Sequence, residues 1–110
     1  MAVWYRVRDL DAARAFYRDV LGLVEVESNA AERWVTLLRG QAEIGLAEGE
    51  PEPEGAVALI DVDDVRGEAE RLRALGVDVG TVLELHAEIR LLDVFDPDGN
   101  RVQLAEELRE

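Results

Sequence analysis

Hydrophobic and polar residues alternate from residue 2 to residue 8, in the segment AVWYRVR. A period of two is typical of a strand that is buried on one face. The next segment, DLDAARAFYRDVLG (residues 9–22), has its apolar residues at helical spacing. We expect a helix there, with Asp9 or Asp11 at its N-cap and Gly22 as the left-handed residue at its end. Three strand-like segments follow at residues 23–28, 32–38 and 42–48.

The same order of elements returns after a proline- and glutamate-rich linker at about residues 49–55. A strand is predicted at residues 56–62, a helix at 63–76, and strands at 77–85, 88–95 and 100–106. The helix-ending glycines Gly22 and Gly76 are 54 residues apart (76 minus 22), and IGLAE (44–48) returns as VQLAE (102–106). This internal repeat predicts a single domain, residues 1–110, with one module at about 1–48 and a second at about 56–110.

The repeated order predicts an α+β fold made of two tandem βαβββ modules. In each module the helix covers one face of the sheet, and strand twist makes the other face concave. Together the modules would form an eight-stranded cupped sheet with the helices outside. A pocket between two such modules is a natural place for a small-molecule ligand.

Charge and composition narrow the classes of partner. The formal net charge is −13, and all twelve basic residues are arginine. Such acidity argues against nucleic acid and would attract a cationic ligand, although solubility alone also explains it. The chain has no cysteine, which removes disulfides and thiolate metal ligands. No apolar run approaches the roughly 18 residues of a membrane span, so we expect a cytoplasmic protein without membrane contact.

Alternation also predicts which side chains face the cup. In the first strand Tyr5 and Val7 should face the helix, which leaves Trp4 and Arg6 for the cup. A hairpin turn at Arg39-Gly40 would place Trp34 directly opposite Gly45. The other predicted inward residues are Glu43, Val57, Leu59, Asp61, Arg101, Gln103 and Ala105. In the strand at 88–95 the two faces are not distinguished, so the side of Arg90 stays open.

Three segments carry a resemblance to a known superfamily: VRDLDAARAFYRDVLGL (7–23), DVDDVRGEAERLRALGV (61–77) and DPDGNRVQLAE (96–106). With them the chain resembles, over essentially its whole length, the vicinal oxygen chelate superfamily. This superfamily contains glyoxalase I, extradiol dioxygenases, and fosfomycin- and bleomycin-resistance proteins. The resemblance implies that in metal-using members four inward side chains, usually histidine, glutamate or glutamine, bind a divalent ion.

The four implied metal positions fall on Ala2, Gly45, Val57 and Gln103. Three of them offer no donor atom, whereas a divalent transition metal needs at least three protein ligands. The only histidine, His86, lies in the predicted connection between the sixth and seventh strands, and the only serine, Ser28, is expected in a loop. We therefore predict a metal-free member with no cofactor and no catalytic residue.

The favoured function is binding of a small molecule, cationic or aromatic, by a homodimer of bleomycin-resistance type. Trp4 and Trp34 offer flat faces to a ring or a cation. The resemblance places Arg6 where glyoxalase I relatives hold an anionic part of the substrate, and Arg90 at a frequent arginine before the DPDG turn. The predicted ligand-binding residues are Trp4, Arg6, Trp34, Gly45, Val57, Asp61, Arg90 and Gln103.

Structural interpretations of these residues stay open. The two tryptophans could fill a dry cup, and Gln103 could be a relic position. The arginines could have protein partners: Glu43 and Asp61 in a buried ionic cluster with Arg6 and Arg101, or Asp96 and Asp98 for Arg90. Two other functions also stay open. One is a lyase, isomerase or dioxygenase with an atypical metal site using Gln103 and Glu43, and the other is a ligand-free structural or regulatory dimer.

Overall fold

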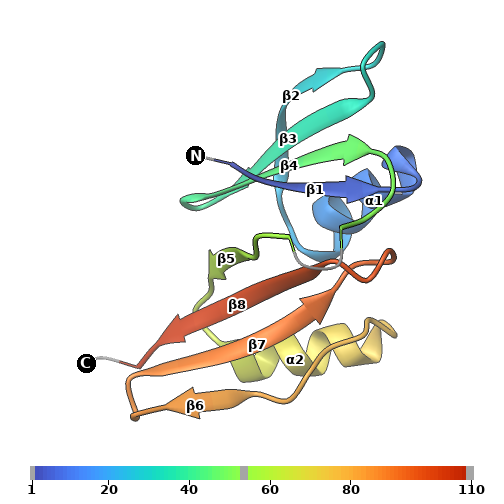
Figure 1. Cartoon of the computed structure of the whole chain (residues 1–110). Coiled ribbons are helices and arrows are strands. Elements are labelled where there is room, and N and C mark those ends of the chain that lie inside the picture. Colours follow the sequence, from blue (N-terminus) through green and yellow to red (C-terminus); the bar gives the residue numbers. More distant parts are fainter. Residues whose placement is uncertain (1, 53–54, 109–110) are drawn as a thin grey trace.

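The computed structural model describes residues 2–52 and 55–108, which form two modules with the same order of elements (Figure 1). The first contains β1 (Val3–Val7), α1 (Leu10–Ala15), the π-helical turn η1 (Phe16–Val20), β2 (Val24–Asn29), β3 (Trp34–Arg39) and β4 (Ala42–Glu48). The second contains β5 (Ala58–Asp61), α2 (Val65–Ala74), β6 (Leu83–Leu85), β7 (Ile89–Phe95) and β8 (Arg101–Glu107). The predicted α+β fold of two tandem βαβββ modules is confirmed.

Within the described residues, the strands of each module form their own four-stranded sheet. The strand orders are β1-β4-β3-β2 and β5-β8-β7-β6, with β1 parallel to β4 and β5 parallel to β8. The eight strands of the cup are thus divided between two sheets, and β1 and β5 each lie at a sheet edge. In Figure 1 the second sheet lies below the first, α1 lies behind the first sheet, and α2 packs against β7 and β8.

Three local predictions were wrong. The β3–β4 hairpin turns at Gly40-Gln41 instead of Arg39-Gly40, so Trp34 lies opposite Ala47 rather than Gly45. The positive φ of Gly40 (59°) falls on the first turn residue, and because the shift is two residues Trp34 keeps its predicted face. The strand predicted at 77–85 is regular only at Leu83–Leu85, with an isolated bridge at Val79, and Ser28 lies in β2 rather than in a loop.

The core follows the alternation of the strands. In the first module Tyr5 and Val7 are buried together with Ile44 and Leu46, on the face that meets α1. In the second module the buried positions are Ala58, Ile60, Leu92, Val94, Val102 and Leu104, with Val65, Ala69 and Leu72 of α2 packed on them. Burial of Leu92 and Val94 shows that Arg90, at the same parity of β7, is on the helix side of the second sheet.

Both helices begin with the same arrangement of side chains. Asp9 caps α1 by accepting a hydrogen bond from Ala12 N (3.1 Å), and Asp64 caps α2 by accepting one from Gly67 N (3.0 Å). Their ends also match, because Gly22 and Gly76 have φ values of 73° and 78°, as predicted for left-handed caps.

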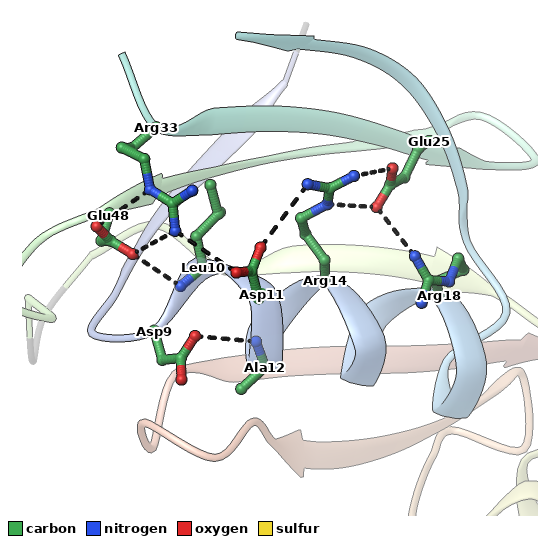
Figure 2. A network of polar contacts seen from close by, with 9 residues as sticks. All are labelled: Asp9, Leu10, Asp11, Ala12, Arg14, Arg18, Glu25, Arg33 and Glu48. Carbon is green, nitrogen blue, oxygen red and sulfur yellow. Dashed lines mark hydrogen bonds and ion pairs between the residues drawn. The ribbon is translucent and has the colours of Figure 1, made fainter. Parts of the chain in front are cut away.

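A glutamate from the last strand of each module also reaches the first turn of that module's helix. Glu48 Oε2 accepts from Leu10 N (3.1 Å), and Glu106 Oε1 accepts from Val65 N (3.0 Å). These are the glutamates of the repeated LAE segments. An arginine holds each one: Arg33 contacts Glu48 at 3.0 Å (Figure 2), and Arg90 contacts Glu106 at 3.5 Å. The repeat in the sequence is therefore also a repeat of helix-capping contacts.

The two modules meet along a contact that we call the module seam. Tyr17 of η1 donates its hydroxyl hydrogen to Asp96 Oδ2 of the turn before β8 (2.9 Å). Asn100 Nδ2 donates to the carbonyl oxygen of Arg6 in β1 (3.0 Å). Tyr5 accepts from Ala58 N (2.8 Å) and donates to the carbonyl oxygen of Arg101. These contacts tie β1 and η1 to the start of β5 and β8.

Candidate functional site

Two adjoining hollows lie at the module seam. The first, of about 440 Å³, is lined by Tyr5, Glu52, Val57, Phe95, Asn100 and Arg101, with Gly55, Ala56 and Gly99. The second, of about 380 Å³, is lined by Trp4, Tyr5, Arg6, Ala47, Glu52, Gly55 and Asn100. Because four lining residues are shared, the hollows adjoin. Their volumes fall in the range of small-molecule sites, roughly 300–1,000 Å³.

Trp4 forms an aromatic wall of the second hollow. Its side chain stands on the β1 face opposite the core, as predicted, and 49% of its surface is exposed. The indole lies across Gly45 on the neighbouring strand β4, and a Cβ atom on Gly45 would overlap the ring. Trp34 meets it edge to face, with ring centroids 6.1 Å apart and an interplanar angle of 77°. Trp34 thus braces Trp4 and is not among the residues that line either hollow.

Arginine side chains stand at both hollows, each in a loose ion pair. Arg6 Nε lies 3.4 Å from Glu52 Oε1 in the linker, and Arg101 Nη1 lies 3.5 Å from Asp93 Oδ2 on β7. The side chains of Arg6 and Arg101 are 60% and 49% exposed, so the alternative of a buried ionic cluster was wrong. Gln103 donates to the other oxygen of Asp93 (3.1 Å), which fixes its amide on the second sheet.

The floor of the hollows is a buried polar network. Asp96 is buried and accepts from the backbone N–H groups of Asp98 and Asn100, from the Asn100 amide, and from Tyr17. Burial raises the pKa of the Tyr17 hydroxyl, and the neighbouring Asp96 raises it further. Burial also raises the pKa of Tyr5. Both tyrosines therefore stay protonated at neutral pH and act as hydrogen-bond donors, which keeps the floor rigid.

The structure brings only part of the predicted site to these hollows. Trp4, Arg6 and Val57 line them, and Gly45 lies beneath Trp4. Asp61 lines a different, acidic depression with Asp63, Glu106 and Glu107. Arg90 contacts Glu84 (2.9 Å) and Glu106 instead of either the cup or the DPDG turn, so the interpretation that it braces the turn through Asp96 or Asp98 was wrong.

Sequence reasoning missed several lining residues, among them Tyr5, Glu52, Phe95 and Asn100. Tyr5 was assigned to the core, which is correct for its ring but not for its hydroxyl edge. Glu52 lies in the linker, where alternation gives no prediction. The DPDGN segment did hold a signal for Asn100, because an asparagine after the turn glycine can reach backbone groups across the turn.

The residues at the four metal positions that the superfamily implies do not fit a divalent ion. Ala2, Gly45 and Val57 provide no donor atom in their side chains, which leaves only the amide of Gln103, whose Nε2 donates to Asp93. The indole of Trp4 also fills the space above Gly45 where a ligating side chain would have to stand. Among the residues that the structure describes, no group of three or more histidine, cysteine, aspartate or glutamate side chains could hold a metal.

Two βαβββ modules with a hollow at their junction define a class of small α+β domains with paired modules. The family model of the Glyoxalase/Bleomycin resistance protein/Dioxygenase superfamily matches residues 2–104, and the chain belongs to this superfamily. The resemblance to the vicinal oxygen chelate proteins is thereby confirmed. A comparison with curated proteins finds no match.

Solved structures with the same fold include a lyase, an integron cassette protein and a resistance protein. Lactoylglutathione lyase from Agrobacterium tumefaciens is 27% identical, with a TM-score of 0.77 over 96% of this chain and 91% of that one. The integron cassette protein HFX_CASS4 from the Halifax Harbour sewage outfall metagenome is 20% identical, with a TM-score of 0.83 over 96% of both chains. The fosfomycin resistance protein FosX from Listeria monocytogenes, complexed with Mn(II) and sulfate, is 21% identical (TM-score 0.78; 97% and 88% covered). The two identities below 25% show likeness of fold alone.

In the part of the chain that the structure describes, neither α1 nor α2 is long and apolar enough to cross a membrane.

Proposed function

We propose that the chain binds a small aromatic molecule in the two hollows at the module seam, which we call the seam hollows. The observation that carries this proposal is their lining. Trp4 and Phe95 contribute aromatic side chains to the lining, while Arg6 and Arg101 contribute charged groups. Apolar walls with a few polar groups are typical of small-molecule sites.

Aromatic character of the ligand is supported by the arrangement of Trp4. Its ring is held flat across Gly45 and is braced by Trp34, yet about half of its surface stays exposed. Exposed indole is costly in water, and stacking of a planar ring on it is favourable. The backbone of Gly45 is in a conformation that any residue can adopt, but only glycine leaves room for the indole above it. The indole is therefore preorganised for a planar partner.

Intrinsic tryptophan emission and calorimetry test this proposal on the purified protein. We expect emission of the wild type to be quenched by members of a panel of one- and two-ring aromatic compounds of different charge. Trp4→Ala should weaken binding measured by calorimetry about tenfold, because one stacked ring contributes about 1 kcal/mol or more. Trp34→Ala, the matched control, should weaken it less, since Trp34 only braces Trp4. The absence of any response to the whole panel would contradict the proposal.

We also propose that the chain forms a homodimer through the cup-side surface of β5 around Leu59. Leu59 is 48% exposed although its side chain is large and apolar. Exposed apolar side chains on a sheet face are typical of interfaces.

A charged substitution at the centre of the proposed interface tests the dimer. Light scattering on a sizing column should give twice the chain mass, 2 × 12.2 kDa, for the wild type. Leu59→Asp should give the mass of one chain, because it would bury an unpaired carboxylate in the interface. Leu75→Asp, at a leucine after α2 that is 59% exposed, should leave the dimer intact. A monomeric wild type at high concentration would contradict the proposal.

A further inference from the structure

The lining of the seam hollows holds more arginine than carboxylate, although the chain as a whole has a formal net charge of −13. In the described part of the lining the charged residues are Arg6, Arg101 and Glu52. Arg101 is paired with Asp93 on β7, outside the lining, and Arg6 is paired with Glu52 within it. Arg6 is therefore the guanidinium group that a ligand with its own negative charge would contact in place of Glu52.

The one carboxylate comes from the linker and not from either sheet. Glu52 lines both hollows and contacts Arg6 at 3.4 Å, longer than a well-formed charge-assisted hydrogen bond of about 2.7–2.9 Å. Both side chains are more than half exposed. Ion pairs of this kind contribute little to stability, so a better-placed anion can displace Glu52 from Arg6.

Neighbouring contacts keep Glu52 close to Arg6. Gly49 N donates to the carbonyl oxygen of Val7 (2.9 Å), which holds the start of the linker against β1. One step along, Glu50 lies 3.5 Å from Arg8. A carboxylate tethered in this way acts at a high effective concentration and competes with any free anion for the same guanidinium group.

We propose that Glu52 is an internal occupant of the anion site on Arg6 and makes the seam hollows selective for aromatic carboxylates. The ring of the ligand lies on Trp4, and its carboxylate replaces Glu52 on Arg6. The selectivity arises because only an anion recovers the interaction that Arg6 loses when Glu52 leaves. This inference rests on the proposed ligand-binding function of the same hollows.

Three ligands that share one ring and differ in charge test the inference by calorimetry on the full chain: 2-naphthoate, 2-naphthamide and 2-naphthylmethylammonium. We expect the wild type to bind the carboxylate most tightly and the ammonium least. Glu52→Gln should raise the affinity for naphthoate about three- to fivefold, the value of an exposed ion pair, and leave that for naphthamide nearly unchanged. Arg6→Ala should lower the affinity for naphthoate about tenfold or more.

A second arginine–glutamate pair provides the matched controls. Arg8, the residue after β1, pairs with Glu50 of the linker, and neither is among the residues lining either hollow. Arg8→Ala and Glu50→Gln should change the affinity for naphthoate less than about twofold. Circular dichroism of each variant shows that the fold is intact.

The outcomes separate the inference from the function on which it rests. Tightest binding of the ammonium, equal binding of all three ligands, or an unchanged affinity in Glu52→Gln would overturn the inference. If such binding still depends on Trp4, the proposed function stands. If none of the three ligands binds, the inference is overturned, and the broader aromatic panel decides the function.

Discussion

At the scale of single residues, the face of a side chain could be predicted in most strands, though not in β7, but its partner could not. Alternation correctly buried Tyr5 and Val7 and left Trp4 and Arg6 on the other face of β1. The ion pair between Arg6 and Glu52 depends on the path of the linker, which periodicity does not describe. The Tyr5 hydroxyl bridging Ala58 and Arg101 likewise depends on how the modules dock.

The glycine beneath the indole gives a prediction at this scale. Gly45→Ala should force the Trp4 ring out of its position, because the new Cβ would overlap it. We expect a loss of about 1 kcal/mol in the free energy of unfolding, from the strained rotamer and the lost contact with Trp34. Denaturant titration measures this loss, and tryptophan emission should shift to longer wavelength.

The double variant Trp4→Ala/Gly45→Ala provides the control. Without the indole, alanine at position 45 should cost nothing or stabilise the strand, since alanine is better than glycine in a regular strand. If Gly45→Ala lowers the free energy of unfolding equally with and without Trp4, the position of the indole does not depend on the glycine.

At the scale of elements, order and type followed from the pattern, while the exact ends did not. The helix starts at Asp9 and Asp64 and the stops at Gly22 and Gly76 have local signals, so they could be read from the sequence. The π-helical form of Phe16–Val20 has no such signal. The β3–β4 turn was predicted one residue too early. Gly40 can occupy either turn position, so the local sequence does not distinguish the two placements.

The ion pair between α1 and β2 gives a prediction of pH dependence (Figure 2). Two hydrogen bonds from Arg14, each 2.8 Å, hold the pKa of Glu25 below its ordinary value of 4.5. A lowered pKa in the folded state means that this stabilisation is complete above pH 4.5 and is lost as the pH falls through the folded-state pKa. The free energy of unfolding of Glu25→Gln should therefore decrease less than that of the wild type between pH 6 and pH 3.

Variants of Arg14, the partner of Glu25, test this interpretation. Arg14→Gln should reduce the pH dependence by a similar amount, and the double variant should reduce it no further. At pH 7 each single variant should cost about 0.2–1 kcal/mol, the range of a partly exposed ion pair. If Glu25→Gln keeps the full pH dependence of the wild type, the pair does not contribute to it.

At the scale of the whole molecule, the internal repeat predicted two modules and a ligand site between them. The candidate site lies at the seam rather than deep within a continuous cup, because the strands form two sheets and β1 stays an edge. The contacts that set the seam join residues far apart in the sequence, such as Tyr17 and Asp96. Such contacts depend on how the two modules dock against each other, and no local sequence pattern predicts them.

The seam gives a prediction of its own. Tyr17→Phe removes the hydroxyl that donates to the buried Asp96 and should lower the free energy of unfolding by about 1–3 kcal/mol. In an Asp96→Asn background the same change should cost clearly less, because its acceptor is already altered. Equal costs in both backgrounds would show that Tyr17 does not act through Asp96.

The location of the ligand is the central claim, and amide and indole NMR shifts of the ¹⁵N-labelled protein during a 2-naphthoate titration test it most directly. Saturable shifts are expected at the Trp4 indole N–H and at the backbone N–H groups of Gly55, Asn100 and Arg101, which border the seam hollows. Shifts centred instead on the groove between Arg39 and Glu68, with the Trp4 signal unmoved, would contradict the claim.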